Sequence, residues 1–220
     1  MRGVWSHLVA LGFRLLYNEL AWLYDPVSWL VSRGLWRRWQ RTALAYLPPG
    51  AHVLEVGFGP GHLLADLARD GHRAVGLDVS RAMLTLARRR LHRRGLAGGL
   101  CRGRAEHLPF VSGAFDAVIL TFPTPFIYDA LWLANLRRVL RTPSKDKPGG
   151  RLILVLQASF VRGRALDRFM EWLYRITGQR GGPTDLCCLL QGHGFRAWRE
   201  RVAVDGTQVG VLLAEVLPAD

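Results

Sequence analysis

Short apolar runs alternate along the chain with longer segments in which apolar residues recur at helical spacing. Runs at 52–56, 74–77, 98–104, 115–120 and 151–156 predict buried strands. Apolar residues three or four positions apart predict helices that begin at His62, run from 81 to about 94, and run from 129 to 141. Two final strands, at about 195–204 and 207–217, meet at Asp205-Gly206, a dipeptide typical of hairpins. Strands that alternate with helices indicate an α/β fold with a largely parallel sheet.

One stretch joins the first strand of this pattern to the first helix. It reads Val53-Leu54-Glu55-Val56-Gly57-Phe58-Gly59-Pro60-Gly61-His62, so a carboxylate within an apolar run is followed by three alternate glycines. These glycines permit positive φ angles and let a ligand approach without meeting a Cβ atom. The helix that follows points its unpaired N–H groups into the turn. The stretch predicts a cradle for a nucleotide-type cofactor, with a glycine-rich turn that binds nothing as the alternative.

The spacing excludes two common cradles. The dinucleotide fingerprint is G-x-G-x-x-G, and the phosphate-binding Walker loop ends in Gly-Lys-Ser/Thr; this stretch has neither. Glu55 precedes the first glycine by two residues, where its charge would repel a pyrophosphate. The carboxylate favours a ligand with a cationic group, held directly or through water.

A second carboxylate, Asp78, follows the apolar run 74–77, about twenty residues beyond the glycines. A ribose-binding acid occupies this place in a βαβ unit, and its two oxygens can accept both ribose hydroxyls. Ser80 is the expected N-cap of the next helix. Met83 lies on the first turn of that helix, either as a core residue or facing an adenine ring.

Together these motifs resemble the class I S-adenosylmethionine (SAM)-dependent methyltransferases, and the resemblance covers most of residues 20–160. In the N-terminal segment, Tyr24-Asp25-Pro26 resembles the pattern of the ubiquinone/menaquinone-biosynthesis C-methyltransferases and their small-molecule relatives. The resemblance to the class implies a Rossmann-like, doubly wound sheet of seven strands, mostly parallel with the last strand antiparallel. It also implies SAM as cofactor and S-adenosylhomocysteine as product. The cofactor-binding residues that it implies are Tyr24, Glu55, Gly57, Phe58, Gly59, Gly61, Asp78, Val79, Met83, Arg104, Ala105, Glu106, Thr121 and Phe122.

Two segments depart from patterns known in this class. Arg104 stands where the family usually has an aspartate that holds the adenine amino group, and arginine cannot accept a hydrogen bond. That contact is therefore lost, replaced by the backbone and Glu106, or replaced by stacking of the guanidinium on the base. The segment Thr121-Phe122-Pro123-Thr124 lacks the Asn/Asp-Pro-Pro-Tyr/Phe motif of amino-methylating nucleic-acid enzymes, which argues against a nucleic-acid substrate.

Residues 1–48 are expected to form a helical cap ahead of a SAM-binding core at 49–220. Trp22, Trp29, Trp36 and Trp39 recur among arginines there, a composition typical of interfacial helices. Contact with an anionic membrane surface and simple closure over the cofactor are both open interpretations.

The triplet Tyr24-Asp25-Pro26 resembles the N-terminal pattern of the same family. The resemblance makes Tyr24 a candidate lid over the cofactor. Asp25 is expected to be the N-cap of a helix that begins at Pro26. Residues 160–177, where apolar residues alternate with arginines, are expected to lie near the substrate entrance.

Composition changes the picture in two respects. The net charge is +13, and Lys145 and Lys147 are the only lysines, so arginine carries nearly all of the positive charge. This permits nucleic acid, anionic lipid or acidic substrates as partners, although a genomic bias toward arginine would give the same composition. Three cysteines, two of them adjacent, match neither a disulfide framework nor a zinc site, so no metal is expected. No signal-peptide cleavage site or membrane-spanning run is evident, which favours the cytoplasm and leaves peripheral association with the inner face of the membrane open.

The sequence therefore predicts a SAM-dependent methyltransferase for a small apolar or membrane-associated acceptor, of the quinone-precursor or lipid type. The alternatives are an RNA methyltransferase that uses the basic surface and an inactive SAM- or lipid-binding module. His62, His107 and His193 are candidate general bases by residue type, but no catalytic base is assigned. The oligomeric state is not predicted.

Overall fold

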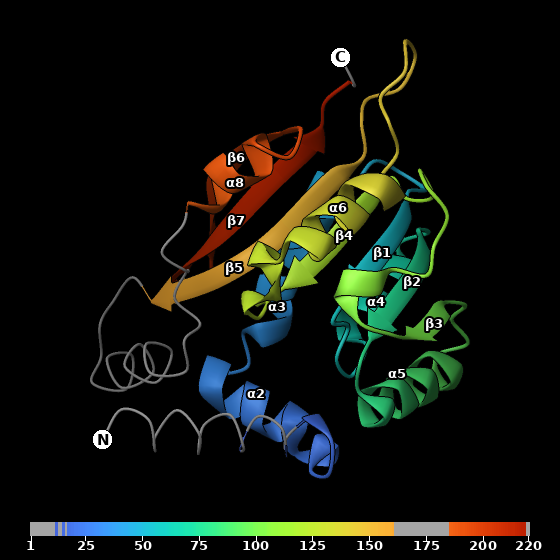
Figure 1. The fold of residues 1–220 in the computed structure, drawn as a ribbon. Helices are drawn as coiled ribbons and strands as arrows, with labels where there is room; N and C mark the ends of the chain where they lie inside the picture. Colours follow the sequence, from blue (N-terminus) through green and yellow to red (C-terminus); the bar gives the residue numbers. More distant parts are fainter. Residues whose placement is uncertain (1–11, 13–14, 16, 161–184, 219–220) are drawn as a thin grey trace.

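A computed structural model describes residues 12, 15, 17–160 and 185–218. Its strands form one seven-stranded sheet in the order β3-β2-β1-β4-β5-β7-β6 (Figure 1). The strands are β1 His52–Val56, β2 Arg73–Asp78, β3 Gly99–Arg102, β4 Ala117–Thr121, β5 Arg151–Phe160, β6 Phe195–Val204 and β7 Thr207–Val216. Neighbours from β3 to β5 are parallel, and β7 is antiparallel to both β5 and β6. The predicted sheet, mostly parallel with an antiparallel last strand, is confirmed.

The helices follow the predicted pattern and add short turns between the strands. Their bounds are η1 Ala21–Leu23, α2 Tyr24–Ser32, α3 Trp36–Arg41, η2 Thr42–Tyr46, α4 His62–Arg69, α5 Arg81–Arg93, η3 Ala105–His107, η4 Pro125–Tyr128, α6 Ala130–Val139 and α8 Leu186–Gln191. The Ser80 side chain accepts a hydrogen bond from the Met83 backbone at 3.2 Å, so the predicted N-cap of α5 is confirmed. Strand β5 runs beyond the predicted end at 156 because it stays paired with β7 as far as Phe160.

Two apolar layers sandwich the sheet. On one face, α6 and α8 bury side chains that include the fully enclosed Trp132. On the other face, α3, η2, α4 and α5 pack around Trp39, whose indole N–H donates to the Thr207 hydroxyl at 2.9 Å. Helix coverage on both faces explains why the central strands read as continuous apolar runs rather than as an alternating pattern.

The first part of the segment before β1 lies near the end of the sheet at which the parallel strands terminate, while α3 and η2 pack on its face. Figure 1 shows α2 beyond the arrowhead of β5, at the carboxyl edge, where ligands bind in open α/β folds. In the described ranges, no helix has both the length and the apolarity needed to cross a bilayer. Most of the segment expected near the substrate entrance, residues 161–177, lies outside the described residues.

Candidate active site

The glycine turn after β1 has the conformation that its sequence predicts. Gly57, Gly59 and Gly61 have φ angles of 72°, 54° and 75°, which L-residues with a Cβ rarely adopt. A Cβ added at Gly57 or Gly59 would meet no atom within 4 Å, so open space adjoins these two residues. A Cβ at Gly61 would lie 2.6 Å from that of Ala87, so this third glycine permits α4 and α5 to pack closely. The turn is therefore open toward a ligand at its first two glycines only.

Asp78, at the end of β2, organises the same turn. One carboxylate oxygen accepts from the Gly59 N–H at 3.0 Å, and the other accepts from the Ser80 N–H at 2.8 Å. Burial raises the pKa of Asp78, although these N–H groups oppose the shift. The side chain thus faces the glycine turn, where the predicted contact with a ribose would take place.

Glu55 is the most unusual polar residue of the site. It is 1% exposed, and neither carboxylate oxygen makes a hydrogen bond of ordinary geometry to a described residue, although the Leu64 backbone N–H lies close enough to oppose the rise in its pKa. Burial, reinforced by the charges of Asp78 and Asp66, raises the pKa of Glu55 well above its ordinary range. A buried carboxylate without a partner is costly, and in native structures such groups call for a functional explanation. A cationic ligand group would supply the missing partner.

Two tyrosines of the N-terminal segment lie close to Asp78. Tyr24, at the start of α2, contacts Tyr17 edge to face, with ring centroids 5.5 Å apart. Desolvation raises the pKa of the Tyr24 hydroxyl well above its ordinary value, and the nearby hydroxyl of Tyr17 and the charges of Asp25 and Asp78 act in the same direction. Tyr17 also holds the start of α5, because its carbonyl accepts from the Ser80 hydroxyl at 2.5 Å. The lid role of Tyr24 stays a prediction, and Tyr17 lies beside it.

The carboxyl end of β4 meets α3. The Thr121 hydroxyl accepts from the Gln40 side-chain amide at 3.0 Å, and the Phe122 ring stacks on Trp36 at 4.1 Å between centroids. Phe122 has a φ angle of 52°, an uncommon conformation for an aromatic residue that often accompanies functional sites. The side-chain oxygen of Gln40 is buried without a partner among the described residues. Aromatic rings and one free acceptor thus line the edge beside the glycine turn.

The remaining predicted residues differ in how they are placed. Arg104 is exposed and pairs with Glu106 at 2.8 Å, so these two side chains hold each other in this structure. The neighbouring Ala105 is buried, while the Val79 side chain is 58% exposed. Arrangement of these residues around an adenine stays a prediction.

Two further predicted residues have side chains in the core. The Met83 side chain is fully buried, and the Phe58 ring packs so closely on β2 that a Cβ at Gly76 would lie 2.5 Å from it. Phe58 therefore presents its backbone, rather than its ring, to the turn. The structure shows Met83 as a core residue, and its contact with an adenine ring stays a prediction.

The prediction that Asp25 caps a helix beginning at Pro26 is wrong. Helix α2 begins one residue earlier, at Tyr24, and Asp25 lies inside its first turn. Its carboxylate is 2.9 Å from the His62 Nε2 atom and 2.7 Å from the Arg90 guanidinium. The guanidinium also donates to the Pro60 carbonyl in the glycine turn. Asp25 thus links the cap to α4 and α5. Hydrogen bonds to two basic groups stabilise a charged carboxylate more than the single backbone N–H bond of an N-cap would.

Several arginines of the cap are engaged by acids of the core. Arg37 and Arg41 pair with the buried Asp66 at 3.2 and 3.0 Å, and Arg38 pairs with Asp205 at 2.5 Å. These contacts attach α3 to the core. The tryptophans of α2 and η1 stay exposed, with Trp22 68% and Trp29 65% accessible.

Sequence reasoning missed the contributions of Tyr17, Gln40 and Arg90. Tyr17 precedes Tyr24 by seven residues, two helical turns, which is the only local signal for their contact. Gln40 and Arg90 carry no local signal, because their partners Thr121 and Asp25 are 81 and 65 positions away.

Comparison with known proteins agrees with this geometry. Residues 53–143 match the family described as "Methyltransferase domain". The demethylmenaquinone methyltransferase of Beutenbergia cavernae is 37% identical over 141 residues, which are 63% of this chain and 55% of that protein. The ubiquinone/menaquinone biosynthesis C-methyltransferase of Geobacter sulfurreducens is 31% identical over 178 residues, which are 77% of this chain and 67% of that protein. The chain thus spans just over half of the first of these relatives and two thirds of the second.

A solved structure supports the fold alone. Phospholethanolamine N-methyltransferase 2 of Haemonchus contortus, in complex with phosphomonomethylethanolamine and S-adenosylhomocysteine, superposes with a TM-score of 0.57 at 17% identity. The match covers 81% of this chain and 53% of that one. From the sheet order, the open glycine turn with its two acids, and the identity to curated relatives, the chain belongs to the SAM-dependent methyltransferase family.

Proposed function

We propose that the protein transfers a methyl group from SAM to a small apolar acceptor of the quinone-precursor or lipid type. The observation that carries the proposal is Glu55, a buried carboxylate with no charged partner among the described residues, next to Asp78 and a turn open at Gly57 and Gly59. A ligand with an ammonium group and a ribose would satisfy both acids. The names of the curated relatives support the quinone-type acceptor.

The residues present fit this cofactor. Glu55 and the free oxygen of Gln40 would accept from its amino group, Asp78 would accept from its ribose hydroxyls, and Gly57 and Gly59 would leave room for its chain. When bound, SAM supplies a methyl group on a sulfonium that is already activated for in-line displacement. The chain then has to align the acceptor and exclude water, because proximity and orientation account for much of such a rate enhancement.

Apolar side chains at the carboxyl edge support an apolar acceptor. Phe122 stacks on Trp36, and Trp39 contacts both Phe122 and Phe160 at about 6 Å between ring centroids. The Arg33 guanidinium lies 4.9 Å from the centre of the Phe160 ring. We also propose that the protein is cytoplasmic and contacts the inner face of the membrane through the exposed apolar side chains of α2.

Calorimetry with SAM, followed by an assay of S-adenosylhomocysteine formation, tests this proposal. Acceptors to be compared are a demethylated quinone precursor, a lipid extract and total RNA. We expect product with the quinone precursor or the lipid extract. Product with RNA but with neither of the other acceptors would establish the alternative function, an RNA methyltransferase, which the net charge of +13 suggests. SAM binding without product from any acceptor would favour the inactive module, and absence of binding at millimolar SAM would refute the proposal.

A further inference from the structure

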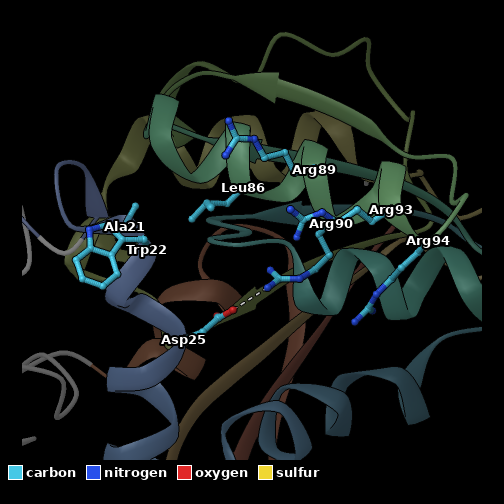
Figure 2. Close-up of a pocket in the computed structure, with 8 residues that line it drawn as sticks. All are labelled: Ala21, Trp22, Asp25, Leu86, Arg89, Arg90, Arg93 and Arg94. Atoms are coloured by element: carbon cyan, nitrogen blue, oxygen red, sulfur yellow. Dashed lines mark hydrogen bonds and ion pairs between the residues drawn. The ribbon is translucent and has the colours of Figure 1, made fainter.

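A cavity lies between the cap and α5. Its volume is about 300 Å³, and α5 forms one wall with η1 and the start of α2 opposite (Figure 2). The residues that line it are Ala21, Trp22, Asp25, Leu86, Arg89, Arg90, Arg93 and Arg94. Neither Glu55, Asp78 nor a turn glycine is among them. The cavity is therefore distinct from the proposed cofactor site.

The charge of this cavity is strongly positive. Four arginines face one carboxylate, Asp25, which is already engaged by Arg90 and His62. Arg89, Arg93 and Arg94 have no acidic partner in the part of the chain that the structure describes. Burial lowers the pKa of Arg90, Asp25 opposes this, and the charges of Arg94 and Arg37 lower it further. Asp25 thus compensates only part of this positive charge, and a bound anion would compensate more of it.

The gathering of arginines follows from the helix geometry. At 3.6 residues per turn, Arg89 and Arg93 lie one above the other on α5, with Arg90 and Arg94 beside them. In Figure 2 the Arg90 guanidinium reaches Asp25 of the cap, with Arg93 beside it, Arg89 above and Arg94 below. Arg81 and Arg88 project from a different side of the same helix and do not line the cavity.

We propose that this cavity binds the phosphate of an anionic phospholipid at a bilayer surface. Guanidinium groups match phosphate oxygens in charge and in bidentate geometry. Ala21 and Trp22 of the opposite wall and Leu86 of α5 add apolar side chains to the lining, and Trp22 is 68% exposed. Tryptophan and arginine together suit the interface between headgroups and acyl chains. The exposed Trp29 and Leu30 of α2 extend the apolar surface.

These contacts favour a lipid over a nucleic acid. A nucleic-acid backbone presents a row of phosphates and is bound by basic residues spread along it. Here the unpaired arginines converge on one cavity beside exposed apolar side chains, an arrangement that fits a single headgroup with its chains. The cap arginines Arg37, Arg38 and Arg41 are engaged by Asp66 and Asp205, so α5 supplies the positive charge next to Trp22.

Vesicle co-sedimentation of the full chain without SAM tests this inference independently of methyl transfer. The vesicles contain phosphatidylglycerol mixed with phosphatidylcholine, or phosphatidylcholine alone, at about 0.1 M salt. The cavity variant is Arg89→Gln/Arg93→Gln, and the matched control is Arg81→Gln/Arg88→Gln, which removes the same charge from the same helix outside the cavity. Urea denaturation checks that both variants fold.

We expect the wild type to bind only vesicles with phosphatidylglycerol. The cavity variant should bind about 30-fold more weakly, because each arginine near an anionic surface contributes about 1 kcal/mol and a tenfold change corresponds to about 1.4 kcal/mol. The control should stay within threefold of the wild type. Competition by millimolar glycerol phosphate would further support a site for the phosphate itself.

Other outcomes would overturn the inference. Equal loss in both variants would mean that only overall charge matters, and no loss in either would mean that the cavity is not used. Binding of glycerol phosphate without vesicle binding would overturn the assignment to lipid. Binding of RNA, rather than vesicles, with loss in the cavity variant alone would reassign the cavity to nucleic acid.

Discussion

Glu55→Gln is the most informative substitution, because it keeps the shape of the side chain and removes its charge. The wild-type carboxylate is 1% exposed and lacks a described hydrogen-bond donor. We expect the variant to be more stable than the wild type without cofactor and to bind SAM less tightly. A gain in stability with a loss of binding is the usual signature of a residue kept for function.

The gain in stability should depend on pH in a defined direction. The ordinary pKa of this glutamate is 4.5, and burial followed by the charges of Asp78 and Asp66 raises it in the fold. Above about pH 4.5 the folded wild type therefore retains a proton that the unfolded chain has lost, and its stability falls as pH rises, by at most about 1.4 kcal/mol per pH unit. Glutamine does not titrate. The stability difference should be constant below about pH 4.5, grow in favour of the variant above it, and level off beyond the raised pKa.

The loss of binding follows from the missing charge. A hydrogen bond to a charged group contributes about 1.5–3 kcal/mol, so SAM affinity should fall by a factor of roughly 10 to 150. In the wild type, a cation placed against Glu55 should also displace the proton that this carboxyl retains between pH 4.5 and its raised pKa. Calorimetry in two buffers of different ionisation enthalpy would detect that proton, and it should be absent from the variant.

Urea denaturation from pH 4 to 8 and SAM titration of both proteins test this reasoning. Unchanged SAM affinity in the variant would show that Glu55 does not contact the cofactor. A variant that is less stable than the wild type at pH 8 would show that the carboxylate has a partner within the fold. Either result would refute the assignment of Glu55 to a cationic ligand group.

Three further substitutions test neighbouring parts of the site. Asp78→Asn should weaken SAM binding at least tenfold in calorimetry, because a neutral amide replaces the ionised acceptor of the ribose hydroxyls, and unchanged affinity would contradict that role. Ser80→Ala should lower the free energy of unfolding in urea by about 1 kcal/mol or more, because it removes both the cap to Met83 and the bond to the Tyr17 carbonyl, and no change would show that neither bond stabilises the fold. Burial would raise the pKa of Asp25, but the contacts with His62 and Arg90 have a larger, opposite effect, so the pKa is lowered. Asp25→Asn should therefore lower the melting temperature above about pH 3.8, and the difference from the wild type should vanish on further acidification; a difference that is independent of pH would contradict the ion pairs.

Local features of the fold could be predicted from the sequence because their causes are local. Alternate glycines after an apolar run permit positive φ angles, and the Gly57–Gly61 turn has them. Ser80 caps α5 because its hydroxyl reaches the backbone only three residues ahead. The final strands, joined at Asp205-Gly206, were predictable for the same reason.

The sequence by itself determined the α/β class, the strand–glycine–helix cradle and the two acids beside it. Tertiary structure alone decided that Glu55 would be buried without a partner, that Tyr17 would join Tyr24 beside Asp78, and that Asp25 would bind His62 and Arg90. It also decided which arginines are free, since Arg37 finds Asp66 while Arg89 faces an open cavity. The physical reason is range: backbone conformation follows from neighbours in sequence, whereas desolvation and charge pairing depend on groups that meet only when the chain has folded.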